Sequence, residues 1–420
     1  MAALIRERSV LRQSRYLILP LVVALVAIAA AWWFARPLEP DAFYSLPGPV
    51  PSKPGELLRQ EAFDRDVPTD ARAWRILYTT TRFDGTPTLG SAIVMVSIDK
   101  SSGPRPVIAW THGTTGVVPG CAPSLLDRPF ENVPALRQLI DQGWIFVGTD
   151  YTGQGTTGPH PYLIGEGEAR SALDAVRAAR RIDDIRADAP TVVWGHSQGG
   201  HSALWTGIVA PDYAPDVPIA GVAAIAPASD LRPLIDAVQH TPVGRIMSSF
   251  VLLAYSESYP DVALEDYVTM RARLFARDMA NRCLAGRKAL FSVFEAIMVG
   301  DTIFATPPTS GALGKRLAQN TPDRPLRQPL LIAQGLADTL VLPQIQSGFV
   351  RRQCGAGQIL EYRTYAGQDH LSVVAPDSPL APDLVRWTQD RIADAAPPAS
   401  CLGLGAQPPV AADTPQAARR

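Results

Sequence analysis

The chain has 420 residues, of which 46% are hydrophobic, so it can bury a sizeable core and intrinsic disorder is excluded as its main state. Its 39 Lys and Arg side chains nearly balance its 40 Asp and Glu side chains, and the formal net charge is −1. A chain this close to neutral gives no sign of a general affinity for nucleic acid, which requires a basic surface. The 39 prolines favour long connections and disfavour a simple helical bundle.

The N-terminus has the composition of an export segment. Residues 1–15 form a basic segment, expected to stay cytoplasmic, and residues 16–35 form an uncharged, almost wholly apolar run. About 20 apolar residues can cross a bilayer as a helix. Two interpretations stay open: an uncleaved signal anchor that holds the protein at the membrane, and a signal peptide cleaved near Ala27-Ile-Ala29. Both predict that the rest of the chain is exported, either membrane-anchored or secreted.

The next part of the chain predicts an α/β fold. Residues 36–72 are expected to form an extended N-terminal arm, and two strands are expected at residues 73–81 and 89–98. Short apolar strands then alternate with helices, which predicts a mostly parallel sheet flanked by helices on both faces. The expected strands are residues 106–110, 144–149, 191–194, 219–226, 329–334 and 359–365, and the clearest helices are residues 168–182 and 384–395.

One long interval interrupts this alternation. Residues 229–311 have a helical pattern without a clear strand, with Asp230 expected to cap the first helix and residues 264–284 expected to form a longer one. An insertion of this kind is interpreted as a helical cap over the carboxyl ends of the strands. It divides the core into residues 73–228 and 312–395, and residues 396–420 are expected to form a C-terminal tail.

The strongest chemical signal is the segment Gly195-His196-Ser197-Gln198-Gly199, which follows a predicted strand and precedes a helix-compatible run. This is the pattern and context of the nucleophile elbow of α/β-hydrolases. A strand that turns sharply into a helix holds the serine in a strained conformation, so the flanking glycines are required by space. The sequence therefore predicts Ser197 as a catalytic nucleophile.

A serine hydroxyl needs a base, and the base needs an acid that orients it. His370 is the histidine that follows the last predicted strand, where the serine, acid, histidine order of this fold requires the base. Asp338 follows the strand at residues 329–334 and is the expected acid. Asp369 is its competitor, but side chains of adjacent residues in an extended loop point apart; Asp323 precedes the strand and would lie at the wrong end.

The oxyanion of a tetrahedral intermediate needs preplaced donors. One is expected to be the backbone N–H of Gln198, the residue after the nucleophile. The other is expected from the loop Thr111-His112-Gly113-Thr114-Thr115-Gly116, with Gly113 and Thr114 as candidates. This chemistry requires no metal and no organic cofactor.

A glycine-rich segment and four cysteines could each indicate a binding site. Gly153-Gln-Gly155-Thr-Thr-Gly158 spells a dinucleotide-binding fingerprint, but Pro159-His-Pro161 follows, so no helix can begin where that motif needs one. The four cysteines, Cys121, Cys283, Cys354 and Cys401, contain no Cys-x-x-Cys pair, which disfavours a zinc site. In an exported protein an even count favours two disulfides, with three pairings open.

The sequence resembles the secretory lipase family of α/β-hydrolases, the lipase-A type. The matching segments are Asp41-Ala-Phe-Tyr44, Trp110-Thr-His-Gly-Thr-Thr-Gly116, Cys121-Ala-Pro-Ser124, Thr149-Asp-Tyr-Thr-Gly-Gln-Gly155, the Gly-His-Ser-Gln-Gly elbow, Gly335-Leu-Ala-Asp338 and Asp369-His370. The resemblance implies a helical cap, the disulfides Cys121–Cys283 and Cys354–Cys401, and serine hydrolysis of acylglycerols or other carboxylic esters. Lipase-A types often carry an aspartate in the oxyanion loop, whereas this chain has two threonines there.

The expected function is therefore an exported serine hydrolase whose substrate is a carboxylic or lipid ester. An acyltransferase that uses the same acyl-enzyme, or a short-chain carboxylesterase, is the alternative. A catalytically silent binding protein on the same fold is disfavoured by the complete set of Ser, His and Asp.

Overall fold

The computed structural model describes residues 20, 22–23, 26–28, 30–99, 103–183, 185–286, 289–397 and 401. The basic segment 1–15, part of the predicted leader 16–35 and most of the predicted tail 396–420 lie outside the described residues. In the part of the chain that is described, no helix is both long enough and apolar enough to cross a membrane.

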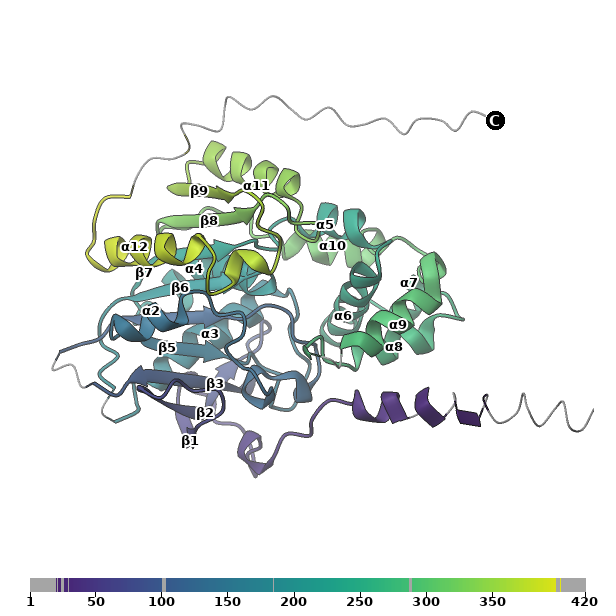
Figure 1. Ribbon diagram of the computed structural model, residues 1–420, viewed down its shortest axis with the longest axis horizontal. Helices are drawn as coiled ribbons and strands as arrows, with labels where there is room; N and C mark the ends of the chain where they lie inside the picture. The colour runs from purple at the N-terminus through teal and green to yellow at the C-terminus, as the bar shows by residue number, and fades with distance from the viewer. Residues whose placement is uncertain are drawn as a thin grey trace, which may run out of the picture.

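The described strands form one nine-stranded sheet in the order β1-β2-β3-β5-β4-β6-β7-β8-β9 (Figure 1). Their bounds are β1 Leu57–Phe63, β2 Ala71–Thr81, β3 Pro87–Ser97, β4 Val107–Thr111, β5 Ile145–Thr149, β6 Thr191–His196, β7 Ile219–Ile225, β8 Leu330–Gly335 and β9 Leu360–Tyr365. The strands from β5 to β9 run parallel, and β1 to β3 form an antiparallel edge. The predicted fold class is confirmed.

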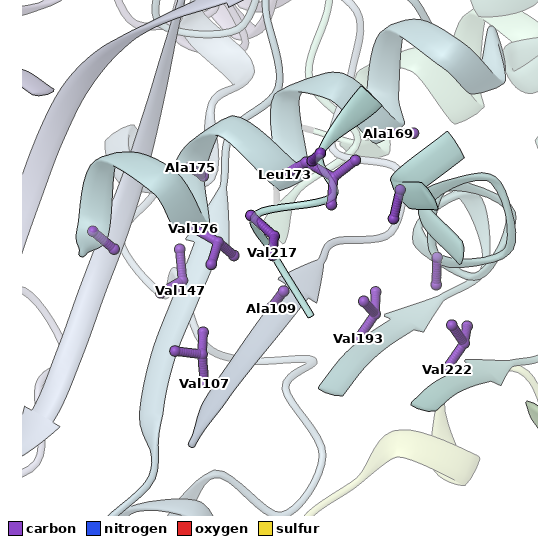
Figure 2. Packing of buried hydrophobic residues seen from close by; sticks show 14 of the residues in the cluster. Val107, Ala109, Val147, Ala169, Leu173, Ala175, Val176, Val193, Val217 and Val222 are labelled. Carbon is purple, nitrogen blue, oxygen red and sulfur yellow. The ribbon is translucent and has the colours of Figure 1, made fainter. Parts of the chain in front are cut away.

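Helices cover both faces of the sheet because the parallel strands are apolar on both sides. Successive side chains of a strand alternate between faces, so Val107 and Ala109 of β4 pack on one side and Ile108 and Trp110 on the other. The first face is covered by α3 Gly165–Ala179, α4 Gln198–Tyr213 and α11 Pro343–Gly355, and the second by α2 Leu136–Asp141 and α12 Leu380–Ile392. Figure 2 shows strand valines lying against α3 in the first layer.

One strand was not anticipated. Residues 57–63 were assigned to the extended arm, but β1 pairs with β2 in an antiparallel register. The reason is that β1 is an edge strand whose middle residues, Arg59, Gln60 and Glu61, are partly or fully exposed, so it lacks the apolar pattern of a buried strand.

The predicted cap is a group of helices inserted between β7 and β8, which Figure 1 shows to one side of the sheet. They are α5 Leu231–Val238, α6 Pro242–Ser258, α7 Leu264–Tyr267, α8 Arg273–Ala280, α9 Ala289–Val299 and α10 Gly311–Gln319. Their apolar faces form a core of their own, which includes Phe250 and Tyr255 of α6 and Leu313 and Leu317 of α10. The cap core therefore extends beyond residue 311.

Two expectations for the cap were wrong. Residues 264–284 do not form one helix: α7 and α8 are separate, because Val268 leaves the helical path and pairs with Phe304. Asp230 stands at the N-cap position of α5, but its side chain does not cap the helix. Its carboxylate instead accepts a hydrogen bond from Arg352 at 2.7 Å. Arg352 belongs to α11, so an ion pair between two helices takes the place of the expected cap hydrogen bond.

A partly buried charged cluster joins α8, α9 and the N-terminal segment. Asp278 of α8 accepts hydrogen bonds from Arg282 at 2.6 Å and from the indole of Trp32 at 3.2 Å. Glu295 of α9 lies 3.6 Å from Arg282. Burial raises the pKa of Glu295 to about 8, the adjacent Asp278 adds to the rise, and Arg282 opposes it.

Glu295→Gln is expected to stabilise the protein at pH values well above 4.5 and to give no gain below pH 4.5. Because the folded pKa of Glu295 lies above its unfolded value near 4.5, its contribution to stability is present below pH 4.5 and is lost as the pH rises toward 8. Glutamine cannot ionise, so the variant should gain on the wild type by as much as about 1.4 kcal/mol per pH unit across that window. Urea denaturation at pH 5 and pH 8 measures the difference.

The exposed pair between Glu265 and Arg277 supplies the matched control for that series. Glu265→Gln makes the same chemical change at an exposed position and is measured at the same two pH values. An equal difference from the wild type at pH 5 and pH 8 for Glu295→Gln would contradict the assigned protonation.

Candidate active site

Ser197 lies at the sharp turn between β6 and α4, with backbone angles of φ 59° and ψ −118° that non-glycine residues rarely adopt. The turn is tight enough to exclude side chains on both flanks. A Cβ atom on Gly195 would lie 2.0 Å from the carbonyl oxygen of Gly199, and one on Gly199 would lie 1.8 Å from that of Thr111. The two glycines therefore allow β4, β6 and α4 to meet behind the serine.

Gly199→Ala is expected to destabilise the protein by at least about 3 kcal/mol, because its Cβ would overlap backbone atoms of β4 that cannot move alone. Gly348→Ala in α11 is the matched control, since its nearest neighbour would be a side-chain tip 3.9 Å away. That change should be neutral or stabilising by about 0.5–1 kcal/mol. Urea denaturation distinguishes the two, and equal stabilities would contradict the close approach.

The structure brings Ser197, His370 and Asp338 together from three separate segments. The Nε2 atom of His370 lies 2.9 Å from the Oγ atom of Ser197, and its Nδ1 atom lies 2.8 Å from Oδ2 of Asp338. Asp338 lies in the loop after β8, and His370 lies in the loop after β9. Each loop follows the carboxyl end of a parallel strand. The side chains of Asp338 and His370 therefore lie beside Ser197 at the same edge of the sheet.

The side chain of Asp338 accepts hydrogen bonds from donors other than the histidine. Its Oδ1 atom accepts from the backbone N–H groups of Leu340 and Val341, both at 2.8 Å, and Oδ2 accepts from the amide of Gln334 at 3.2 Å. These bonds fix the carboxylate so that one oxygen faces His370. Asp323 lies away from this group, 3.7 Å from the exposed Arg352.

Asp369, the competing acid, is engaged in its own loop. Its carboxylate accepts from the backbone N–H groups of Leu371 and Ser372 at 3.0 and 2.7 Å. These bonds and the neighbouring His370 lower the pKa of Asp369, with the Ser372 bonds as the largest cause. It is exposed and closes the turn that carries the histidine.

A second histidine, His196, holds the loop that carries His370. The Nε2–H of His196 donates to the backbone carbonyl of His370 at 2.8 Å, and the two rings lie 4.7 Å apart. Burial lowers the pKa of His196 well below its ordinary value, and His370 lowers it further. His196 is therefore a neutral donor that holds His370 in place.

The oxyanion candidates lie beside the serine. Gln198 is the first residue of α4, and the first N–H groups of a helix have no acceptor within it. A Cβ atom on Gly113 would lie 3.7 Å from that of Ser197 and 3.3 Å from the carbonyl oxygen of His196, so the loop after β4 passes close to the elbow. The hydroxyl of Thr114 lies 3.0 Å from that of Tyr162 and is engaged there.

A buried network that the sequence did not reveal holds the side chain of Gln198. Its amide nitrogen donates to Oε1 of Glu168 at 2.7 Å and lies 3.2 Å from Nε2 of His160. Glu168 also accepts from the N–H of Leu163, and its other oxygen lies 3.2 Å from the ring of His201. In the sequence, Glu168 is only the first acid of an expected helix, and its burial beside the elbow depends on how α3 packs on α4.

The cap closes over the serine and forms a small apolar cavity, the cap pocket. Ser197 and Gln198 line it at the elbow, with Leu231 and Ile235 of α5 and Met247 and Val251 of α6 as walls. Its volume is about 50 Å³.

Two disulfides tie these parts together. Cys121 follows the oxyanion loop and is bonded to Cys283 after α8, so the cap is crosslinked to the core beside the site. Leu284 strengthens this connection by donating from its N–H to the carbonyl of Thr115 at 2.7 Å. Cys354 of α11 is bonded to Cys401. This is the pairing that the family resemblance implies.

The glycine motif at residues 153–158 does not lead into a helix. Gly153 to Gly158 form turns, and the next helix begins only at Gly165, so no helix N-terminus faces the motif. Among the described residues, no group of three or more His, Cys, Asp or Glu side chains is arranged to hold a metal ion.

A family model described as secretory lipase matches residues 132–399. The chain belongs to the secretory lipase family. A secreted triacylglycerol lipase of Malassezia globosa is 24% identical over 375 residues, covering 84% of this chain and 81% of that protein. A probable inactive lipase of Mycobacterium tuberculosis is 26% identical over 386 residues, covering 85% of this chain and 83% of that protein.

Solved structures have the same fold. Candida antarctica lipase A in its closed state aligns with a TM-score of 0.70 at 18% identity, covering 87% of this chain and 89% of that chain. A ligand-bound form of the rice cell wall degrading esterase LipA of Xanthomonas oryzae aligns with a TM-score of 0.63 at 19% identity, covering 81% and 97%. This secretory lipase is thus a carboxylic-ester hydrolase, and its family and two disulfides indicate an exported protein.

Proposed function

We propose that this secretory lipase hydrolyses acylglycerols or related lipid esters through an acyl-enzyme on Ser197. One relative is described as a probable inactive lipase, so family membership alone does not carry the proposal. The observation that carries it is the continuous hydrogen-bonded chain from Ser197 through His370 to Asp338.

The proposed chemistry takes place in two steps. The Oγ atom of Ser197 attacks the ester carbonyl carbon while its proton passes to Nε2 of His370, and Asp338 stabilises the resulting imidazolium. The negative oxygen is held by the N–H of Gln198 and by the loop at Gly113 and Thr114. His370 then returns the proton to the leaving alkoxide, and the acyl group stays on the serine.

A water molecule completes the cycle. His370 removes a proton from the water as it attacks the acyl carbon, and the tetrahedral intermediate collapses to release the acid and restore the serine hydroxyl. An alcohol in place of water would give acyl transfer instead. Chromatography of the products formed with added glycerol separates hydrolysis, which should dominate, from acyl transfer.

The size of the cap pocket favours a second candidate, a short-chain carboxylesterase. Its volume of about 50 Å³ is far below the roughly 300–1,000 Å³ of common ligand sites. Hydrolysis rates for a series of acyl lengths, above and below the concentration at which each ester forms micelles, distinguish the candidates. Higher rates for long chains above micellisation support the lipase, and a maximum at short chains with no such increase supports the esterase.

A burst of 4-nitrophenol from 4-nitrophenyl acetate tests the acyl-enzyme. The burst should equal one molecule per active protein, and peptide mass spectrometry of the quenched protein should find the acetyl group on the Ser197 peptide. A burst with the acetyl group on another residue would overturn the assignment of the nucleophile.

The export segment is proposed from the sequence as a leader that is either retained as an anchor or removed. N-terminal sequencing of the exported protein distinguishes these outcomes. Retention of residue 1 indicates an anchor, and a new N-terminus near residue 30 indicates a cleaved signal peptide.

A further inference from the structure

One buried carboxyl group on α3 joins two side chains that lie one turn apart on α4. Glu168 is fully buried, and its Oε1 atom accepts a hydrogen bond from the side-chain amide of Gln198 at 2.7 Å. Its Oε2 atom lies 3.2 Å from Nδ1 of His201, three residues after Gln198. A buried charged pair stabilises a fold little compared with apolar side chains of similar size, so this arrangement points to a role in the adjacent site.

The partners of His201 determine where its hydrogens lie. Its Nε2 atom lies 2.7 Å from the backbone carbonyl oxygen of Asn320, which can only accept, so Nε2 carries a hydrogen. Its Nδ1 atom faces the carboxyl group of Glu168. An unprotonated ring nitrogen beside a carboxylate would leave two acceptors in contact in a buried site. Glu168 and His201 therefore share one proton and are neutral as a pair.

The side chain of Gln198 is held through both hydrogens of its amide. One is donated to Glu168, and the other to Nε2 of His160, which lies 3.2 Å from the amide nitrogen. His160 can accept it because its Nδ1 atom lies 3.1 Å from the carbonyl oxygen of Thr152 and carries the ring hydrogen. Burial lowers the pKa of His160 to about 3, which keeps the ring neutral. Gln198 is thus fixed in one orientation.

The same residue supplies the proposed oxyanion donor. The backbone N–H of Gln198 directly follows the strained turn at Ser197, in the first turn of α4, where N–H groups have no acceptor within the helix. A side chain anchored through both amide hydrogens restricts the rotation of that peptide.

We propose that Glu168, through the proton it shares with His201, is a positioning residue that aims the N–H of Gln198 at the oxyanion. The effect is largest in the transition state, because negative charge develops on the substrate oxygen only there. This inference rests on the proposed function, since it names the residues that support the oxyanion site beside Ser197.

Glu168→Met removes both carboxyl oxygens at nearly constant side-chain length. It is expected to lower kcat for ester hydrolysis roughly 10- to 100-fold, somewhat less than complete removal of an oxyanion donor, because the donor is displaced and not lost. KM should change less than about threefold, since the interaction acts in the transition state. Glu166→Met is the matched control, because Glu166 is a partly exposed acid on α3 that pairs with Arg170. It should keep kcat within about threefold.

Glu168→Gln tests the shared proton. Glutamine offers an oxygen that can accept from Gln198 and an N–H that can donate to Nδ1 of His201, so it carries the shared hydrogen covalently. The variant should therefore recover kcat to within about threefold of the wild type. A residue that acted through its negative charge would give the opposite result.

Two further measurements separate positioning from a loss of structure. Gln198→Met keeps the backbone N–H but loses the tether, so it should lower kcat about as much as Glu168→Met does. Trifluoroacetone adds to the nucleophile as an alkoxide that occupies the oxyanion site, and its inhibition constant should weaken by the same factor as kcat/KM. Thermal unfolding shows that each variant is folded.

Three results would overturn the inference. They are a folded Glu168→Met or Gln198→Met protein with kcat within threefold of the wild type, a Glu168→Gln protein as impaired as Glu168→Met, and inhibition by trifluoroacetone that does not follow kcat/KM. Each of these leaves Ser197→Ala inactive. Failure of the proposed function is distinguishable, because Ser197→Ala would then still hydrolyse the ester.

Discussion

Replacement of Ser197 by alanine is expected to reduce kcat for ester hydrolysis by roughly 10⁵- to 10⁶-fold, the loss measured when a serine hydrolase is deprived of its nucleophile. The physical reason is that the reaction loses its acyl-enzyme, and water must then attack an ester held only by the oxyanion donors. Among the described residues, the hydroxyl of Ser197 has one hydrogen-bonding neighbour, His370, so the fold should tolerate the change.

The measurement is steady-state hydrolysis of a soluble ester, together with thermal unfolding of each variant. Ser202→Ala is the matched control, since Ser202 is a buried serine further along α4, and the serine hydroxyl bonded to His370 in the described part of the chain is that of Ser197. It should retain activity within a few fold. A Ser197→Ala protein that stays within tenfold of the wild type would contradict the account.

Asp338→Asn is expected to reduce kcat by about 10⁴-fold without a comparable change in KM. The amide oxygen of the asparagine should take the position of Oδ1, where the N–H groups of Leu340 and Val341 converge. The amide nitrogen then faces Nδ1 of His370 and can only donate to it. His370 would carry its proton on Nε2, facing Ser197, and could not accept the proton of the serine.

Asp369→Asn supplies the comparison, because Asp369 is the other carboxylate adjacent to His370 in the sequence. Its side chain is exposed and binds backbone N–H groups of its own loop. We expect its loss to change kcat less than about tenfold. If Asp369→Asn were the more damaging variant, the acid would have to be reassigned.

The parallel core could be predicted because its strands are buried on both faces. The segments at residues 106–110, 191–194 and 329–334 are short apolar runs between helices, and each matches a strand within two residues. The edge strand β1 could not be recognised in this way, since its middle is exposed. The break at Val268 depends on its pairing with Phe304, a contact 36 residues away that local periodicity does not contain.

Asp338 lies in the loop after β8 and His370 in the loop after β9. These are the positions that the order of the chain and the ends of the strands predict for an acid and a base. The residues that support them could not be found from the sequence. Glu168 and Tyr162 acquire their contacts with Gln198 and Thr114 only when α3 and the preceding loop pack against the elbow. The bond from His196 to the backbone of His370 joins residues 174 positions apart, so local sequence does not contain it.

Labelling with a fluorophosphonate tests the central claim most directly, because the reagent reacts with a serine only where a base activates it. The account predicts one adduct per protein, located on the Ser197 peptide by mass spectrometry, and no labelling of Ser197→Ala. An adduct on another residue, or labelling that persists in Ser197→Ala, would contradict it.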